Sequence, residues 1–182
     1  MISKTATLNL PIELKNTIKI AAFAGISVLS FSIPFFLGYP QWLIGTIVNA
    51  CLFSAAIFLP KKFFLPLIIF PSLGVLLRGV IFGPFTPFLA YFLPFIWLGN
   101  LVLILSFKKL YSFNYPVSVF FAAFAKYLFL MIIANIYFKF QVVPAIFLQA
   151  MGLGQFLTAL AGGMISLVVF NIWKTKHQKQ KN

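Results

Sequence analysis

The chain has 182 residues, of which 62% are hydrophobic and 19% aromatic, and 14 basic residues against one acidic residue give it a net charge of +13. A soluble domain of this size cannot hide so much apolar surface, so the composition indicates a membrane protein. Nucleic-acid binding is not indicated, because the basic residues stand at the ends of apolar segments. Cys51 is the single cysteine, which excludes an intrachain disulfide and a cysteine metal cluster.

Apolar segments near the roughly 20 residues that a helix needs to cross the hydrocarbon recur along the chain. We expect an all-α integral membrane protein, a single domain of six transmembrane helices. The predicted spans are residues 17–37, 41–59, 63–82, 87–107, 116–138 and 151–173, followed by a basic cytoplasmic tail at 174–182.

The start of the fourth span is hard to place because the sequence there, GPFTPFLAYFLP, contains three prolines. Pro84 and Pro87 indicate an outer loop, and Pro94 indicates a kink or an early helical turn. Residues 140–150 are too few to span the membrane, so we expect a loop or a half-buried turn there.

The lysines predict the orientation. If six helices alternate, Lys139 lies alone on one side and eleven lysines lie on the other: Lys4, Lys15, Lys19, Lys61, Lys62, Lys108, Lys109, Lys174, Lys176, Lys179 and Lys181. The positive-inside rule then places both termini in the cytoplasm. A cleaved signal peptide is the alternative for the first segment, which is long for one and lacks a small-residue cleavage pattern.

The scarcity of acidic residues excludes several chemistries. Glu13 is the only one, so no span carries the carboxylate that a proton relay or sodium site usually needs. The sequence has no paired carboxylates, no HExxH and no Gly-rich loop followed by Lys-Ser/Thr, and His177 stands alone in a lysine-rich stretch. We expect no enzyme, no cofactor and no metal site. Uphill transport would take its energy from another subunit.

Two cations fall inside predicted spans. Arg78 lies near the outer end of the third span, where snorkelling to the headgroups, substrate binding and structural pairing are all open. Lys126 lies near the middle of the fifth span, where a lysine costs about 2.5–3.5 kcal/mol. It is therefore neutral, faces a polar cavity or is matched by an acid on a partner. A planar guanidinium suits a carboxylate or phosphate, so we expect a substrate with an anionic or electron-rich group.

Uncharged polar residues outline a cavity. Gln41, Gly45 and Asn49 recur every four residues and share one face of the second span, suited to close helix packing or to a ligand. Asn100 suits a hydrogen bond between helices or a ligand contact, and Trp97 could stack on a ring, although a membrane-belt position is its default. The candidate substrate-binding residues are Arg78, Gln41, Asn49, Lys126, Asn100 and Trp97, with loops 38–40 and 83–87 closing over them.

Small residues form two stripes that would let helices approach closely. The longer stripe lies on the sixth span, and we expect it to pack internally; it comprises Gly154, Thr158, Gly162 and Ser166. The shorter stripe, Ala21 and Gly25 on the first span, packs internally or faces a partner.

The run QWLIGTIVNA, followed by LGVLLRGVIFGPFTPFLAYFLPFIWLGN, resembles the membrane-embedded substrate-binding subunits (S components) of energy-coupling-factor transporters. The resemblance covers residues 41–100. It implies a six-helix subunit, multi-pass in the plasma (inner) membrane of a prokaryote, that captures a vitamin or similar metabolite from outside. Such a subunit docks on a transmembrane coupling subunit driven by two cytoplasmic ATPases.

Those subunits often carry alanine-based small-residue spacing on the first helix for docking, and the matching positions here are Ala21 and Gly25, with glycine at the second. Two other classes stay open. One is a membrane scaffold or assembly protein that has no substrate, and the other is a facilitator that works alone.

Overall fold

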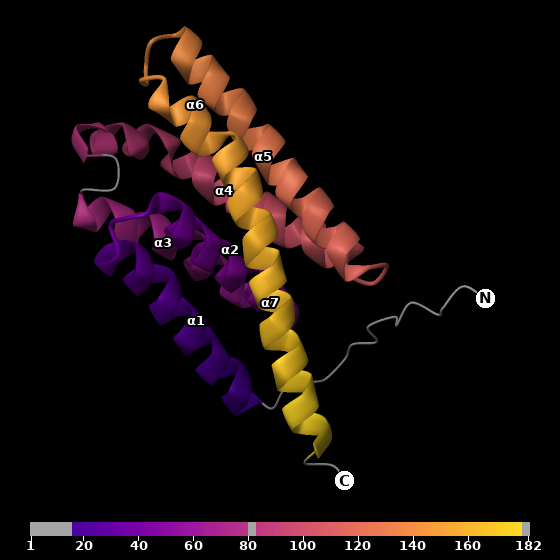
Figure 1. Ribbon diagram of the computed structural model, residues 1–182. Coiled ribbons are helices and arrows are strands. Elements are labelled where there is room, and N and C mark those ends of the chain that lie inside the picture. Colours follow the sequence, from indigo (N-terminus) through magenta and orange to yellow (C-terminus); the bar gives the residue numbers. More distant parts are fainter. Residues whose placement is uncertain (1–15, 80–82, 180–182) are drawn as a thin grey trace.

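The computed structural model describes residues 16–79 and 83–179, and the regular structure within those ranges is helical. Figure 1 shows long helices lying alongside one another, with the start of α1 and the end of α7 at the same end of the bundle. In chain order the elements, of which η1 and η2 are 3-10 helices, are α1 (Asn16–Phe36), α2 (Gln41–Phe58), η1 (Lys61–Phe63), α3 (Phe64–Arg78), η2 (Gly83–Phe88), α4 (Leu89–Leu110), α5 (Tyr115–Lys139), α6 (Ile146–Met151) and α7 (Leu153–Lys179).

Five helical segments are long and apolar enough to cross a membrane: Asn16–Phe36, Gln41–Phe58, Leu89–Leu110, Tyr115–Lys139 and Ile146–Thr175. This agrees with the all-α, multi-pass membrane fold that the composition predicts. The count of six spans and the cytoplasmic side of the termini stay predictions.

Helix α3 differs from the predicted third span. It has 15 residues, a length of about 22 Å at 1.5 Å per residue, which is short of the roughly 30 Å of hydrocarbon. The helix ends because Gly79 adopts a φ of 74°, the left-handed conformation typical of a residue just past a helix C-terminus. The remainder of the predicted span, residues 80–82, lies outside the described residues.

The connections also take more helical structure than the sequence predicts. Pro87 lies within η2 rather than in an irregular loop, and Pro94 lies inside the second turn of α4. Of residues 140–150, which the sequence predicts as a loop or half-buried turn, 140–145 form a turn and 146–150 belong to the short helix α6. Helix α7 continues to Lys179, so most of the predicted basic tail extends this last helix.

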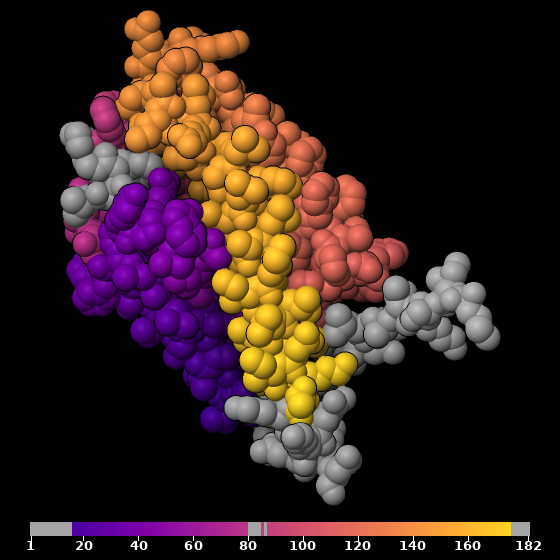
Figure 2. Space-filling view, viewed as in Figure 1, coloured from indigo at the N-terminus to yellow at the C-terminus, as the bar shows by residue number. Residues whose placement is uncertain are grey.

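Helix α2 lies at the centre of the bundle, where Leu52, Phe53 and Ala55 are fully buried. Its neighbour α7 runs along the molecule between α1 and α5 (Figure 2). The two helices meet through small residues: a Cβ added at Gly162 would lie 2.7 Å from the Thr46 carbonyl oxygen and from the Ala50 amide nitrogen of α2.

Further along the α2–α7 interface, the hydroxyls of Ser54 and Ser166 are hydrogen bonded at 3.1 Å. The prediction that the stripe on the last span packs internally is therefore confirmed. The short stripe on α1 points outward instead, because Ala21 is exposed and a Cβ added at Gly25 would meet nothing within 4 Å.

Candidate functional site

A buried ammonium lies at the centre of the bundle. Lys126 is the twelfth of the 25 residues of α5 and is 3% exposed. Its Nζ donates to Oδ1 of Asn49 on α2 and to Oδ1 of Asn100 on α4, each at 2.8 Å. Two residues that the sequence nominated separately as cavity residues thus meet at the lysine that it nominated as the deep cation.

The two carboxamides extend this arrangement to further helices. The amide nitrogen of Asn49 donates to Thr158 Oγ1 on α7 at 3.3 Å, and that of Asn100 donates to the Ile68 carbonyl oxygen on α3 at 3.2 Å. The Thr158 hydroxyl donates in turn to the Gly154 carbonyl oxygen at 2.8 Å. We call Lys126, Asn49, Asn100 and Thr158 the Lys126 network; each member is buried, and together they connect α2, α3, α4, α5 and α7.

The environment of Lys126 is polar but contains no counter-charge from the described part of the chain. Residues 16–79 and 83–179 contain no aspartate or glutamate, so among these residues Nζ is stabilised by the two carboxamide dipoles. Buried polar groups are tolerated when they are hydrogen bonded, and the carboxamide oxygens meet that requirement. An acid on another subunit could not reach Nζ without separating the helices, because the side chain is almost fully covered.

Arg78, in the last turn of α3, donates hydrogen bonds to backbone carbonyls of α1. Its Nη1 donates to the carbonyl oxygens of Phe35, at 2.9 Å, and of Phe36. These carbonyls belong to the last turn of α1, where the helix dipole is negative and carbonyls lack intrahelical partners. The guanidinium also lies so close to Gly38 that a larger residue there would require the Arg78 side chain to move. Arg78 therefore caps α1 from the neighbouring helix.

The other two nominated residues lie apart from the Lys126 network. Gln41 is half-buried in the first turn of α2. The indole Nε1 of Trp97 donates to Ser72 Oγ at 2.6 Å, and Ser72 donates to the Ile69 carbonyl oxygen at 2.8 Å. The indole nitrogen thus forms a hydrogen bond that links α4 to α3.

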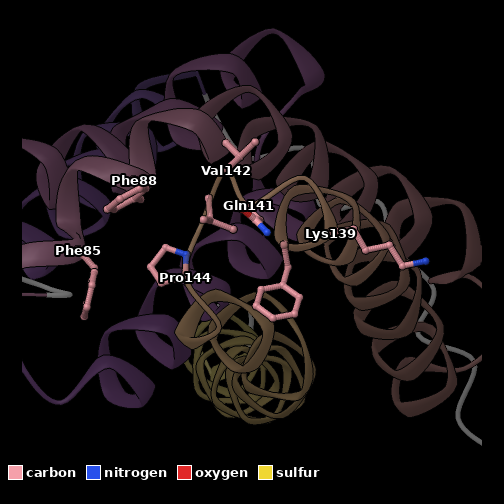
Figure 3. Close-up of a pocket in the computed structure, with 8 residues that line it drawn as sticks. Phe85, Phe88, Lys139, Gln141, Val142 and Pro144 are labelled. Atoms are coloured by element: carbon pink, nitrogen blue, oxygen red, sulfur yellow. The ribbon is translucent and has the colours of Figure 1, made fainter.

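An open pocket of about 640 Å³ lies between η2 and the turn that follows α5. We call it the η2 pocket. It is lined by Phe85, Phe88, Phe138, Lys139, Gln141, Val142, Val143 and Pro144. Figure 3 shows Phe85 and Phe88 on one side and the 141–144 segment on the other. Its volume falls within the roughly 300–1,000 Å³ that is usual for small-molecule sites.

The walls of the η2 pocket are mainly aromatic and aliphatic. Phe88 packs against the buried Phe147: their ring centroids lie 6.5 Å apart, and the Phe147 ring stacks on that of Phe92 at 5.2 Å. The ammonium of Lys139 is directed away from Phe85 (Figure 3). The pocket therefore offers apolar and ring surfaces more than a charged contact.

The turn that forms one wall is conformationally unusual. Gln141 has a φ of 55°, the one positive value at a non-glycine residue in the described ranges. A glutamine held in this left-handed conformation is uncommon, and such residues concentrate at functional sites. The Val142 amide donates to the Tyr137 carbonyl oxygen at 2.9 Å, which fixes the turn against the end of α5.

Sequence reasoning nominated none of the residues that line the η2 pocket, although it expected the 83–87 segment, which contains Phe85, to close over a cavity. Two segments of the sequence could have indicated this pocket. Phe85 and Phe88 stand among prolines, and the apolar triplet Val142, Val143 and Pro144 stands in a segment too short to span. Both segments connect helices on the side that has few lysines.

Comparisons with family models, with curated proteins and with solved structures gave no match to this chain.

Proposed function

We propose that this chain is the substrate-capture subunit of a transporter of the energy-coupling-factor type, which binds a small metabolite from outside and takes its energy from separate subunits. The observation that carries the proposal is the η2 pocket, open and of small-molecule size, at one end of a bundle of apolar helices.

The position of the pocket supports capture from outside. Helix direction places Lys61, Lys62, Lys108 and Lys109 at the opposite end, in the connections that follow α2 and close α4. We call this the lysine end. Under the positive-inside rule the lysine end faces the cytoplasm, and the η2 pocket then opens to the other side.

The outward face of α1 supports docking to a transmembrane coupling subunit. Ala21 is exposed and Gly25 has open space beyond it. Small residues at that spacing allow the backbone of a second helix to approach closely. That subunit would in turn connect the chain to two cytoplasmic ATPases.

The lining of the η2 pocket favours a ring-bearing metabolite, such as a vitamin or a related precursor. Three phenylalanines line it with aromatic rings, and the side-chain carboxamide of Gln141 has two N–H donors and a carbonyl acceptor. The expectation that the substrate has an anionic group was drawn from Arg78. Because Arg78 does not line this pocket, that expectation stays a separate prediction.

Retention of metabolites tests the proposal. The purified chain is incubated with a mixture of water-soluble vitamins and their precursors and washed, and the retained compounds are identified by mass spectrometry. We expect one compound at about one molecule per chain, bound without ATP. Retention of none by a folded protein would favour the scaffold. A facilitator is distinguished in proteoliposomes, where the chain alone would equilibrate the compound across the membrane, whereas a capture subunit would not.

A further inference from the structure

A second feature lies at the lysine end, far along the bundle from the η2 pocket. The Lys108 side chain, from the last turn of α4, crosses the connection between α2 and α3. Its Nζ lies 3.5 Å from the Leu59 carbonyl oxygen and 5.2 Å from the centroid of the Phe64 ring. Between those two contacts stand Lys61 and Lys62. Three lysines therefore lie on or reach across one six-residue segment, residues 59–64.

Aromatic rings hold two of these cations. Lys62 Nζ lies 5.3 Å from the centroid of the Phe63 ring, and Lys108 Nζ lies 5.2 Å from that of the Phe64 ring. A ring face attracts a cation electrostatically, which restrains the ammonium but does not neutralise it. The bond of Lys108 to the Leu59 carbonyl oxygen is long, and it uses only one of three N–H donors.

The charge of this cluster is not balanced by the described part of the chain. Lys61, Lys62 and Lys108 are exposed, and no aspartate or glutamate occurs in residues 16–79 or 83–179. Like charges held near one another repel, and an anion that contacts two of them removes this repulsion and adds charge-assisted hydrogen bonds. The geometry calls for an anion from outside the described residues.

The surroundings indicate an amphipathic anion. Leu65, in the first turn of α3, is 67% exposed, and Leu105, one turn before Lys108 on α4, is 42% exposed. Apolar side chains thus lie along the helices just beside the ammonium groups. A phosphate at the lysines with hydrocarbon chains along the leucines matches both parts, and helix ends lie at the depth where lipid phosphates lie.

We propose that Lys61, Lys62 and Lys108 form a binding site for the phosphate of an anionic glycerophospholipid, with Lys108 as the contact that closes the site across the α2–α3 connection. The site does not depend on the substrate-capture proposal, because it is at the opposite end of the bundle. Lys109, the neighbouring exposed lysine, has no described contact with the connection and provides a matched control.

Lipid binding to the detergent-purified full chain tests the site, with native mass spectrometry used to obtain dissociation constants. The probes are phosphatidylglycerol and phosphatidylcholine. One lysine near an anionic lipid is worth about 1 kcal/mol, about fivefold in affinity. We expect phosphatidylglycerol to bind at least fivefold more tightly than phosphatidylcholine, Lys108→Gln to weaken phosphatidylglycerol about fivefold, and Lys109→Gln to change it less than twofold. The melting midpoint without lipid, which should be unchanged in both variants, shows that each is folded.

Equal affinity for the two lipids would overturn the proposal, and so would an equal loss in Lys108→Gln and Lys109→Gln, which would show a diffuse charge effect. Millimolar inorganic phosphate is added as a competitor to separate the two sources of phosphate. We expect it to leave lipid binding in place, because it cannot contact the leucines. Displacement of the lipid by inorganic phosphate would assign the site to soluble phosphate and contradict the lipid.

Discussion

The Nζ of Lys126 on α5 lies 2.8 Å from the carboxamide oxygen of Asn49 on α2, and both side chains are almost completely buried. A matching bond to Asn100 makes Lys126 the point where three helices meet. Because the oxygens of both asparagines are committed to the lysine, removing the ammonium leaves two buried acceptors without their donor.

Lys126→Met should therefore destabilise the fold by about 1–3 kcal/mol, because the cost of two unsatisfied buried acceptors, about 1–3 kcal/mol each, is partly offset by the removal of a buried ammonium. Unfolding in detergent, followed by circular dichroism, measures the change. Lys139→Met is the control, because Lys139 belongs to the same helix and is exposed; it should stay within about 0.5 kcal/mol of the original chain. A Lys126→Met variant as stable as the control would show that the Lys126 network does not hold the helices together.

Close approach of α7 to α2 gives the next prediction. Gly162→Ala should destabilise the fold by about 1–3 kcal/mol, the usual cost of overpacking. The new methyl group would lie 2.7 Å from backbone atoms of α2. Gly25→Ala is the matched control, because it makes the same change in a helix that has open space. It should raise stability by about 0.5–1 kcal/mol through helix propensity. Equal effects in thermal melts would contradict the interface.

Arg78→Gln should reduce stability by about 1–2 kcal/mol, because the last carbonyls of α1 lose a cationic donor. Arg78→Lys should recover part of this loss, since it keeps the charge without the planar fork. Melting midpoints measure both. The expected role of Arg78 toward an anionic substrate group requires a different result: ligand affinity at least tenfold lower in Arg78→Gln, about 1.4 kcal/mol, with the protein still folded. Unchanged affinity would leave Arg78 with its helix-capping role alone.

The orientation of the bundle can be measured by cysteine labelling in intact cells. Gln141 and Lys109 are both exposed and stand at opposite ends, while the natural Cys51 is buried. A membrane-impermeant maleimide should label Gln141→Cys from outside and should label Lys109→Cys only after the cells are opened. The reverse pattern would contradict the positive-inside assignment and would put the η2 pocket on the cytoplasmic side.

Local patterns in the sequence predicted the parts of the fold that local physics decides. Apolar length predicted most of the membrane helices, and the four-residue spacing of Gly45 and Asn49 predicted a narrow polar face on α2. In the structure Gly45 faces Thr158 and Asn49 joins the Lys126 network. The early end of α3 was missed, because a glycine inside an apolar run does not reveal that it will adopt a left-handed conformation.

The meeting of Lys126 with two asparagines could not be predicted from the sequence, because it depends on which faces α2, α4 and α5 turn toward one another. Periodicity reports which residues share a face of one helix and says nothing of which helix covers that face. The η2 pocket was missed for a related reason. It forms between two connections that are more than 50 residues apart in the chain, and neither connection has a distinctive motif.

Ligand affinity of a pocket variant tests whether the metabolite binds in the η2 pocket. Calorimetric titration with the retained metabolite is compared for the original chain, Phe85→Ala and the control Phe113→Ala, which removes an exposed phenylalanine at the lysine end. Loss of one stacking face in the η2 pocket should weaken binding about tenfold, an upper-range value of about 1.4 kcal/mol for an aromatic pair, while Phe113→Ala should bind like the original chain. Equal affinity in all three proteins would place the ligand elsewhere and contradict capture at the η2 pocket.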